Sequence, residues 1–521
     1  MNLRTRLGKY GMAALFIGLA AIGAQECVQG VEQKLRPAGV AGSFYPADPA
    51  ALTGMIDDML SHASSPPVDG AILAAVVPHA GYQYSGPVAA YTYAALKGRK
   101  YSRVIVIAPS HYEGFGFTSV YDGDGYTTPL GTIRVDKAFA QQLAKMSGSI
   151  RLSERGHRAT SQGAEHALEV QLPWLQRVLG DFTLVPIIMG DQSYESSRAL
   201  GVALAKLLQQ SSSSHQPSNP QETPSDTLIV ASSDLSHYHT YNEAVRMDHK
   251  ALGALQSWDY FSMSRNFDSR IWEACGGAPI VAAMIAAERM GANQARVLKY
   301  ANSGDITGDR SRVVGYSADV FVKAQGAKAE EAPFSLSEEE KAQLLGVARN
   351  SVEHAVREKR TYEPPAIADE VLNQERGAFV TLTEAGALRG CIGYTSGAKP
   401  LYMTVRDTAT LAALRDPRFR PVSASELADL EYEISVLSPL RRVLDAQKIS
   451  VGQHGLLMKN GDREGLLLPQ VPVEQRWDRT KFLEETCVKA GMAPNCWKDE
   501  DTDIFSFTAV IFGEHRRPVV Q

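Results

Sequence analysis

The chain has 521 residues, of which 44% are hydrophobic and 21% are charged, and its formal net charge is −5. Because a domain usually holds about 100 to 200 residues, this length predicts two to four domains. The composition is typical of a globular protein, and the acidic balance excludes the polycationic character of many nucleic-acid-binding proteins. We therefore expect no nucleic-acid partner.

The first thirty residues have the pattern of a secretory signal peptide. Arg4, Arg6 and Lys9 precede the uncharged stretch GMAALFIGLAAIGA, which is shorter than the about 20 residues that a membrane-spanning helix needs. We predict that residues 1–30 are a signal peptide and that no membrane span is left after its removal. This predicts export to the periplasm or the cell exterior, with a cytoplasmic location as the alternative.

The five cysteines are too few and too scattered for a disulfide framework, even in an exported protein. Cys487 and Cys496 are near enough in sequence for a local bridge, which the sequence alone does not establish. The other three are Cys27, Cys275 and Cys391.

Residues 31–325 alternate short apolar runs with longer helical patterns, which is typical of an α/β domain with a mostly parallel or mixed sheet. In GPVAAYTYAALKG, Pro87 is placed for a helix start, and in EHALEVQLPWLQRVLG the apolar residues recur at helical spacing. The apolar runs cover residues 73–77, 104–108, 184–189 and 228–231.

Two stretches of biased composition divide the chain further. QQSSSSHQPSNPQETPSD, residues 209–226, predicts a surface loop within the first domain. KAQGAKAEEAP predicts a linker at 326–334, followed by a second domain at 335–515 whose first helix is capped by Ser335 or Ser337. That domain mixes strands such as LEYEISVL with helices such as KPLYMTVRDTATLAAL, so we expect an α+β fold.

Three of the four apolar runs are followed by polar residues of the same kind. VVPHAGY places His79 after the first run, APSHY places His111 after the second, and SSDLSHY places Asp234 and His237 after the fourth. Ligands of open α/β sheets bind beyond the carboxyl ends of the strands, so these side chains can converge on one site. A lone histidine is more often structural, but independent structural histidines have no reason to share this position.

Neutral imidazole is a common metal ligand whose second ring nitrogen needs an acceptor, and Asp234 is a candidate for that role beside His237. Cys275 in WEACGGAP is a further candidate ligand. Its glycines permit close backbone approach, and a helix that starts after them would favour the thiolate. The alternative is that Cys275 is a small buried hydrophobic residue.

Seven ordered motifs resemble the Memo family, which is similar in fold to class III extradiol ring-cleaving dioxygenases. They are VAGSFYP, VPHAGYQYSGPVAA, APSHY, EHALEVQLPWLQ, SSDLSHY, CGGAP and NSGDITGDRSRVVGY. The resemblance implies that His79, His111 and Cys275 hold a metal, with His237 as the acid/base residue and Asp234 beside it. In the dioxygenases the third metal ligand is a carboxylate. Cys275 at that position is a departure from the dioxygenases that this sequence shares with Memo.

The resemblance favours iron, while a softer thiolate ligand also suits copper, and an open site with His and Cys ligands also suits zinc. Glu165 and His166 in AEHALEVQL lie at a predicted helix start, where a structural cap and a pocket contact are equally open interpretations.

In the second domain, GALRGCIGY is the most distinctive stretch. Arg389 could bind a carboxylate or phosphate and Cys391 could act as a nucleophile, but an ion pair and a buried thiol explain the same residues. His454 and Arg463 are candidate partners of Cys391, although their spacing does not show that they meet it.

ERGAFVTL, LRGCIGY, DPRFRPVS, LEYEISVLSPL, GLLLPQVP and WDRTKFLEETCVKAGM resemble the AMMECR family. Memo-like and AMMECR-like proteins are similar to components B and A of the AmmeMemoRadiSam system, which implies a radical SAM protein as a partner. Fusion raises the effective concentration of the two domains for each other, which favours passing an intermediate or binding one partner jointly.

The leading hypothesis is a metal-dependent enzyme, an iron-dependent oxidoreductase resembling dioxygenases that acts on a small aromatic or enolisable substrate. The second domain would assist binding or perform a second step. The alternatives are a non-catalytic metal-binding or peptide-recognition adaptor and a zinc hydrolase.

Overall fold

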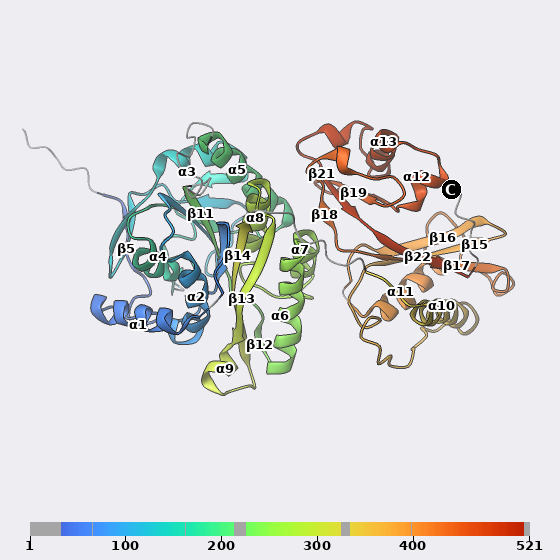
Figure 1. The fold of residues 1–521 in the computed structure, drawn as a ribbon, viewed down its shortest axis with the longest axis horizontal. Coiled ribbons are helices and arrows are strands. Elements are labelled where there is room, and N and C mark those ends of the chain that lie inside the picture. Colours follow the sequence, from blue (N-terminus) through green and yellow to red (C-terminus); the bar gives the residue numbers. More distant parts are fainter. Residues whose placement is uncertain are drawn as a thin grey trace, which may run out of the picture.

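The computed structural model describes residues 33–64, 66–161, 163–212, 226–324, 334–397 and 399–514. The predicted signal peptide and nearly all of the predicted linker lie outside these residues. Figure 1 shows two parts, one running from the blue to the yellow-green segments and the other from orange to red. Among the described residues, no helix is long and apolar enough to cross a membrane.

A nine-stranded mixed sheet forms the centre of the first part. Its four parallel strands correspond to the four predicted apolar runs: β2 (Ala71–Val77), β11 (Thr227–Ser232), β3 (Arg103–Pro109) and β10 (Thr183–Met189). Helices cover both faces of these strands, which explains why they are apolar without alternation. The other strands are β14 (Val313–Lys323), β13 (Gln294–Asn302), β12 (His237–His239), β4 (Thr118–Val120) and β7 (Ile150–Leu152).

Smaller elements complete the first part. A three-stranded sheet lies beside the large one, and a two-stranded ribbon precedes a short 3-10 helix. These elements are β1 (Leu35–Arg36), β5 (Gly125–Thr128), β6 (Gly131–Arg134), β8 (Ala159–Thr160), β9 (Gly163–Ala164), η1 (Glu169–Gln171), α3 (Lys137–Ala144) and α9 (Ser303–Thr307).

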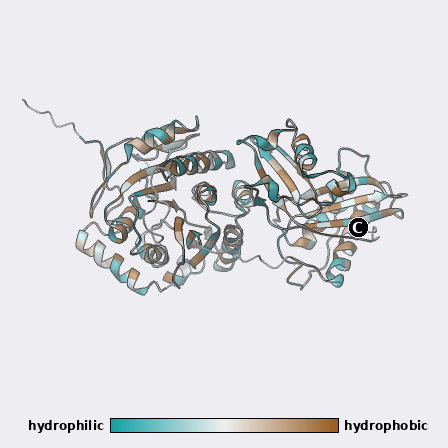
Figure 2. Cartoon of the chain, turned by 45° about the horizontal axis from the view of Figure 1, so that its top comes forward, coloured by the Kyte–Doolittle hydropathy of each residue, from teal (hydrophilic) through white to brown (hydrophobic). Residues whose placement is uncertain are grey.

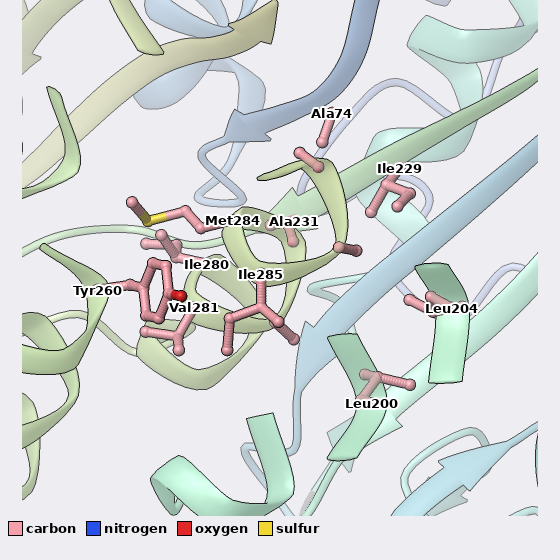
Figure 3. Packing of buried hydrophobic residues seen from close by; sticks show 14 of the residues in the cluster. Ala74, Leu200, Leu204, Ile229, Ala231, Tyr260, Ile280, Val281, Met284 and Ile285 are labelled. Carbon is pink, nitrogen blue, oxygen red and sulfur yellow. The ribbon is translucent and has the colours of Figure 1, made fainter. Parts of the chain in front are cut away.

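The main helices divide between the two faces of the sheet. On one face, α1 (Pro49–His62), α2 (Tyr82–Leu96) and α4 (Leu172–Leu179) bury a core with the strands. The other face is covered by α5 (Tyr194–Ser212), α6 (Tyr241–Gln256), α7 (Tyr260–Asp268) and α8 (Gly277–Arg289). Figure 3 shows Ile280 and Met284 of α8 in this second core, together with Ile229 of β11 and Leu200 of α5.

The predicted helix start at Pro87 is wrong. Helix α2 begins at Tyr82, and Pro87 lies inside it. The start is set by Gly81, whose carbonyl accepts hydrogen bonds from the backbone N–H groups of Tyr84 (2.8 Å) and Ser85 (3.1 Å). The first turn of α2 therefore forms before the proline, and the helix begins three residues after His79.

The second part contains two four-stranded antiparallel sheets with helices packed against them, as expected for an α+β domain. Its first helix, α10 (Glu338–Glu353), starts at the predicted cap Ser337, which forms a capping box with Glu340. One sheet has the order β16 (Ala387–Tyr394), β15 (Ala378–Glu384), β17 (Leu430–Leu437), β22 (Ala509–Gly513). The other has the order β18 (Arg441–Arg442), β21 (Asp503–Phe507), β19 (Gly455–Asn460), β20 (Arg463–Leu467).

The helices that follow α10 are α11 (Leu401–Leu414), α12 (Gln470–Glu474) and α13 (Arg479–Lys489), with one-turn segments at η2 (His354–Glu358), η3 (Ala446–Lys448) and η4 (Cys496–Lys498). A disulfide joins Cys487 of α13 to Cys496 of η4. The bridge that the sequence left open is thus present, and it ties the end of α13 to the turn after it.

The two parts share one hydrophobic core. Phe505 of β21 packs on Phe261 of α7, with ring centroids 5.2 Å apart, and Leu457 and Phe507 join the same cluster. At the edge of this contact, buried Asp503 accepts hydrogen bonds from the first part. Hydrophobic residues, brown in Figure 2, run along strands in both parts.

Candidate metal centre

The predicted site residues converge at the carboxyl ends of the parallel strands. His79 follows β2, His111 follows β3 and Asp234 follows β11. The ring centroids of His79 and His111 are 5.1 Å apart, and the rings meet nearly edge to face. The topology therefore brings together residues that are 32 and 155 positions apart in the chain, because neighbouring parallel strands end at the same edge.

Hydrogen bonds on one side of each ring direct the other side toward the centre. His79 Nδ1 lies 3.0 Å from Ser232 Oγ, whose own hydroxyl donates to the Ala167 carbonyl at 2.6 Å. Ser232 must therefore accept from His79, which leaves Nε2 as the ring nitrogen of His79 with a lone pair. His111 Nδ1 lies 3.0 Å from the Glu165 carboxylate, which leaves its Nε2 free in the same way.

A third histidine completes the group. Ring nitrogens of His79, His111 and His166 all lie within 4.8 Å of one another, so these three residues could hold a metal ion. The His166 ring stacks on that of His111 at 4.7 Å. Its Nδ1 is buried, has no hydrogen-bond partner in the described part of the chain and lies 3.8 Å from the Glu165 carboxylate.

The electrostatics favour the neutral, metal-binding form of His79 and His166. Burial, together with the neighbouring His111, lowers the pKa of His79 well below its usual value. Burial and the adjacent His79 and His111 lower the pKa of His166 to about 3. Burial alone would raise the pKa of Glu165, but hydrogen bonds from His111 and the backbone outweigh it and lower the pKa to about 2.

Cys275, in the segment before α8, lies next to His79 but is not a member of the group of three histidines. Its Sγ lies 3.0 Å from His79 Nε2 and accepts a hydrogen bond from the Asp234 backbone N–H at 3.3 Å. The predicted close approach is present, because a Cβ on Gly276 would lie 2.3 Å from the Ser232 carbonyl oxygen.

The surroundings of Cys275 do not favour the thiolate in the way the sequence predicted. A helix does start after it, but burial and the nearby Asp234 raise the pKa of the thiol. A cation in contact with the sulfur would reverse this, because a coordinating thiol is deprotonated.

Asp234 has a different partner from the one expected. Its Oδ1 accepts hydrogen bonds from the backbone N–H groups of His79 (2.7 Å) and Ala80 (3.3 Å). In the described residues it makes no hydrogen bond to the His237 ring, and the two interact only through charge. The carboxylate therefore holds the His79 backbone in place and does not select the tautomer of His237.

These residues line a cavity of about 750 Å³. His79 is 2% exposed and marks its buried end, whereas Tyr238 is 62% exposed and marks its mouth. His237 of β12 also lines the cavity. Further wall residues are Phe44, Tyr84, Ser303, Asp309, Arg312 and Tyr316.

His166 is the member of this group whose role the sequence left undecided. The signal was its place next to Glu165 in one of the seven motifs, but a histidine at a helix start has no strand end to aim it. Its position depends on a distant contact, since Arg36 donates a hydrogen bond to the Glu165 carbonyl at 2.6 Å.

The second-domain candidates lie together on β16 but have structural partners. Arg389 pairs with Glu426 at 2.7 Å and donates to the Arg420 carbonyl at 2.8 Å. Cys391 accepts a hydrogen bond from Thr381 at 3.3 Å, and burial raises the pKa of its thiol.

The candidate partners of Cys391 belong to the other sheet of that domain. His454 directly precedes β19 and its Nδ1 accepts from the Ser450 backbone N–H at 3.0 Å, while Arg463 begins β20. Among the described residues, neither forms a hydrogen bond or ion pair with Cys391, and we assign no catalytic triad.

Known proteins are similar to both parts. A MEMO1 family protein of Methanopyrus kandleri is 35% identical over 295 residues, which is 55% of this chain and 98% of that protein. A MEMO1 family protein of Aeropyrum pernix is 36% identical over 296 residues, with 55% and 99% covered. A shorter protein of Thermococcus kodakarensis is 46% identical over 188 residues, with 34% and 92% covered.

Among solved structures, an uncharacterized protein of Pyrococcus horikoshii is 41% identical, covers 35% of this chain and 95% of its own, and has a TM-score of 0.34. The family model of Memo-like proteins matches residues 36–320, and that of AMMECR1 matches residues 345–512. Because the first match spans more than half of the sequence, this chain belongs to the Memo family, with an AMMECR1 domain fused behind its Memo domain.

Proposed function

We propose that the Memo domain is a metal-dependent oxidoreductase that resembles class III extradiol dioxygenases, holds iron and acts on a small aromatic or enolisable substrate. One observation carries the proposal. The ring nitrogens of His79, His111 and His166 lie within 4.8 Å of one another, beside Cys275 Sγ, at the buried end of a cavity of about 750 Å³. A cavity of this size accommodates small molecules.

The donor set fits a transition metal. Ring nitrogens of His79, His111 and His166 are the imidazole donors, and the Cys275 sulfur lies 3.0 Å from His79 Nε2. Such ligands suit iron, copper and zinc. When bound, iron would supply the electron-transfer chemistry between substrate and oxygen.

The chain itself would bind and orient the substrate and move a proton. His237 lies on the cavity wall, where an imidazole can take a proton from a substrate hydroxyl. Asp234 holds the backbone of His79, so it positions that ligand and takes no proton in this scheme.

The test is reconstitution of the full chain with Fe(II) under anaerobic conditions. We expect about one iron per chain, with binding lost in His79→Ala and His111→Ala, and oxygen uptake in a panel of catechols and enolisable acids that depends on His237. Equal iron binding by both alanine variants would refute the proposal.

Zinc hydrolysis is a second candidate, because three imidazoles and one thiol suit zinc as well as iron. It requires turnover with zinc in the absence of oxygen. An adaptor, by contrast, requires partner binding that survives loss of the metal ligands, with no turnover under either condition.

We also propose that the AMMECR1 domain assists binding or performs a second step, and that a radical SAM protein is the partner of the fusion. Support comes from the presence of both domains in one chain. Sedimentation of the full chain mixed with such a protein from the same organism should give a complex, and two unchanged boundaries would contradict this.

A further inference from the structure

Tyr238 stands at the mouth of the cavity in a backbone conformation that tyrosine rarely adopts. Its φ is +63°, in the left-handed region, and the pairing of β12 with β14 is irregular at this point. A bulky residue is unfavourable there, and such conformations concentrate at functional sites. The side chain is 62% exposed, more than any other large hydrophobic residue described in the first domain.

The carboxylate of Glu273 contacts the residues before and after Tyr238. Glu273 Oε2 accepts a hydrogen bond from the backbone N–H of His237 at 3.2 Å and lies 3.0 Å from Nε2 of His239. Both residues that flank Tyr238 are therefore fixed by Glu273, which precedes Cys275 by two positions. The backbone that carries the Tyr238 ring is thus hydrogen-bonded to the segment that contains Cys275.

Arg312 lies against this ring. Its guanidinium is 5.1 Å from the centroid of Tyr238, and the residue lines the cavity. In the described part of the chain it makes no hydrogen bond or ion pair. The nearby Asp309 is already engaged, since its Oδ1 accepts hydrogen bonds from the backbone N–H (2.9 Å) and hydroxyl (2.7 Å) of Ser311.

Aromatic side chains also line the cavity. Tyr84 is 38% exposed on the cavity surface, and Phe44 packs on His166 with ring centroids 4.5 Å apart. The cavity therefore combines aromatic side chains with an arginine that has no ion pair in the described part of the chain, although the carboxylate of Asp309 also lines it. Guanidinium groups bind carboxylates through paired hydrogen bonds, and aromatic walls favour planar rings.

We propose that the cavity recognises an aromatic carboxylate, whose ring lies against Tyr238 and whose carboxylate pairs with Arg312. This names the substrate class of the proposed function and rests on it for the reaction, whereas the binding itself requires neither metal nor turnover. Arg312 and Tyr238 are specificity-determining residues in this account.

The experiment compares two probes of nearly equal shape, 2-naphthoate and its neutral analogue 2-naphthamide. Both are titrated by fluorescence into the full chain after metal has been removed with a chelator. We expect the wild type to prefer the naphthoate and Arg312→Gln to weaken naphthoate binding about tenfold or more, with little change for naphthamide. Tyr238→Leu should weaken both probes.

Arg310→Gln is the matched control. Arg310 belongs to the same loop and also stacks on a tyrosine, Tyr241 at 4.4 Å, but it is not among the residues that line the cavity. This variant should leave both probes unchanged. Equal binding of the two probes by the wild type, or an equal loss of both in Arg312→Gln, would overturn the inference.

The outcomes separate this inference from the proposed function. Preference for naphthoate without iron binding or oxygen uptake would refute the proposed function and support the aromatic-carboxylate site. Iron binding without that preference would refute the site alone. Melting temperatures of all variants, compared with the wild type, show whether a loss of binding reflects unfolding.

Discussion

At the scale of single residues, hydrogen bonds decide which nitrogen of each imidazole is available to a metal. Ser232 and Glu165 occupy Nδ1 of His79 and His111, so the Nε2 atoms face the centre. His166 has no comparable partner on its buried Nδ1 among the described residues. The centre is therefore built from two oriented imidazoles and one whose orientation comes from ring stacking.

Replacing His166 by alanine tests whether it belongs to the centre. We expect His166→Ala to lower the affinity for Fe(II) by at least about tenfold, since loss of even an outer contact costs that much. Isothermal titration under anaerobic conditions measures the change. His62→Ala, which removes an exposed histidine of α1, is the control, and an unchanged affinity in His166→Ala would restrict the centre to His79, His111 and Cys275.

Asp319 predicts how stability depends on pH away from the centre. It is fully buried on β14, where burial raises the pKa of its carboxyl to about 7, although Ser317 donates a hydrogen bond to it at 2.7 Å. Between the unfolded value near 4 and pH 7, the folded state binds this proton more tightly than the unfolded state. Its contribution to stability is therefore complete at low pH and falls by at most about 1.4 kcal/mol per unit as pH rises through this window.

The comparison uses Asp319→Asn, which cannot ionise. From pH 5 to pH 8 the melting temperature of the variant should rise relative to that of the wild type, because the wild type loses stability as Asp319 must ionise. A difference that stays constant from pH 5 to pH 8 would show that Asp319 does not change its charge in this window.

At the scale of elements, the segment that carries Glu165 and His166 is clamped to the N-terminal strand β1. Arg36 of β1 donates to the carbonyls of His157 (3.0 Å) and Glu165 (2.6 Å) and forms a buried ion pair with Glu169. Glu169 also accepts hydrogen bonds from the backbone N–H groups of Gly39 and Val40, each at 2.9 Å. The clamp places the third histidine.

Glu169→Gln should destabilise the protein by about 3 kcal/mol, because it leaves the buried Arg36 charge without its partner. We expect a lower melting temperature and weaker metal binding in the same variant. Asp57→Asn removes the exposed pair with Arg177 and should cost less than about 1 kcal/mol. Equal shifts in the two variants would contradict the clamp.

The parallel strands could be predicted from the sequence, because short continuous apolar runs between helical patterns are typical of strands buried on both faces. The sequence also predicted that His79 and His111 meet, since the strand ends alone bring them together. The predicted start of α2 at Pro87 was wrong, because Gly81 is the residue that caps this helix. His166 could not be placed, because the neighbouring Glu165 is held by a hydrogen bond from Arg36, 129 residues earlier in the chain.

At the scale of the whole molecule, the two domains pack against each other through a shared hydrophobic core and are not joined by the linker alone. The linker composition predicted only a raised effective concentration. The interface was not predictable from the sequence. Phe505 and Leu457 lie in strand patterns that look the same as those of residues in the core of the second domain itself. Tertiary contacts alone show that their partners lie on α7 of the Memo domain.

A shared core predicts that the two domains unfold together. The wild type should give one calorimetric transition, and Phe505→Ala should split it into two, because removing a buried phenylalanine costs about 3 to 5 kcal/mol at the interface. Phe482→Ala, buried within the second domain alone, is the control for a general loss of stability. Two transitions in the wild type would contradict the shared core.

The central claim is that the Memo domain holds a metal through imidazole nitrogens and the Cys275 sulfur. The most direct test is metal analysis of anaerobically purified full-length protein beside Cys275→Ser. We predict about one iron per chain in the wild type and a clear loss, or exchange for another metal, in Cys275→Ser. Absence of stoichiometric metal in the wild type, even after addition of Fe(II), would contradict the account.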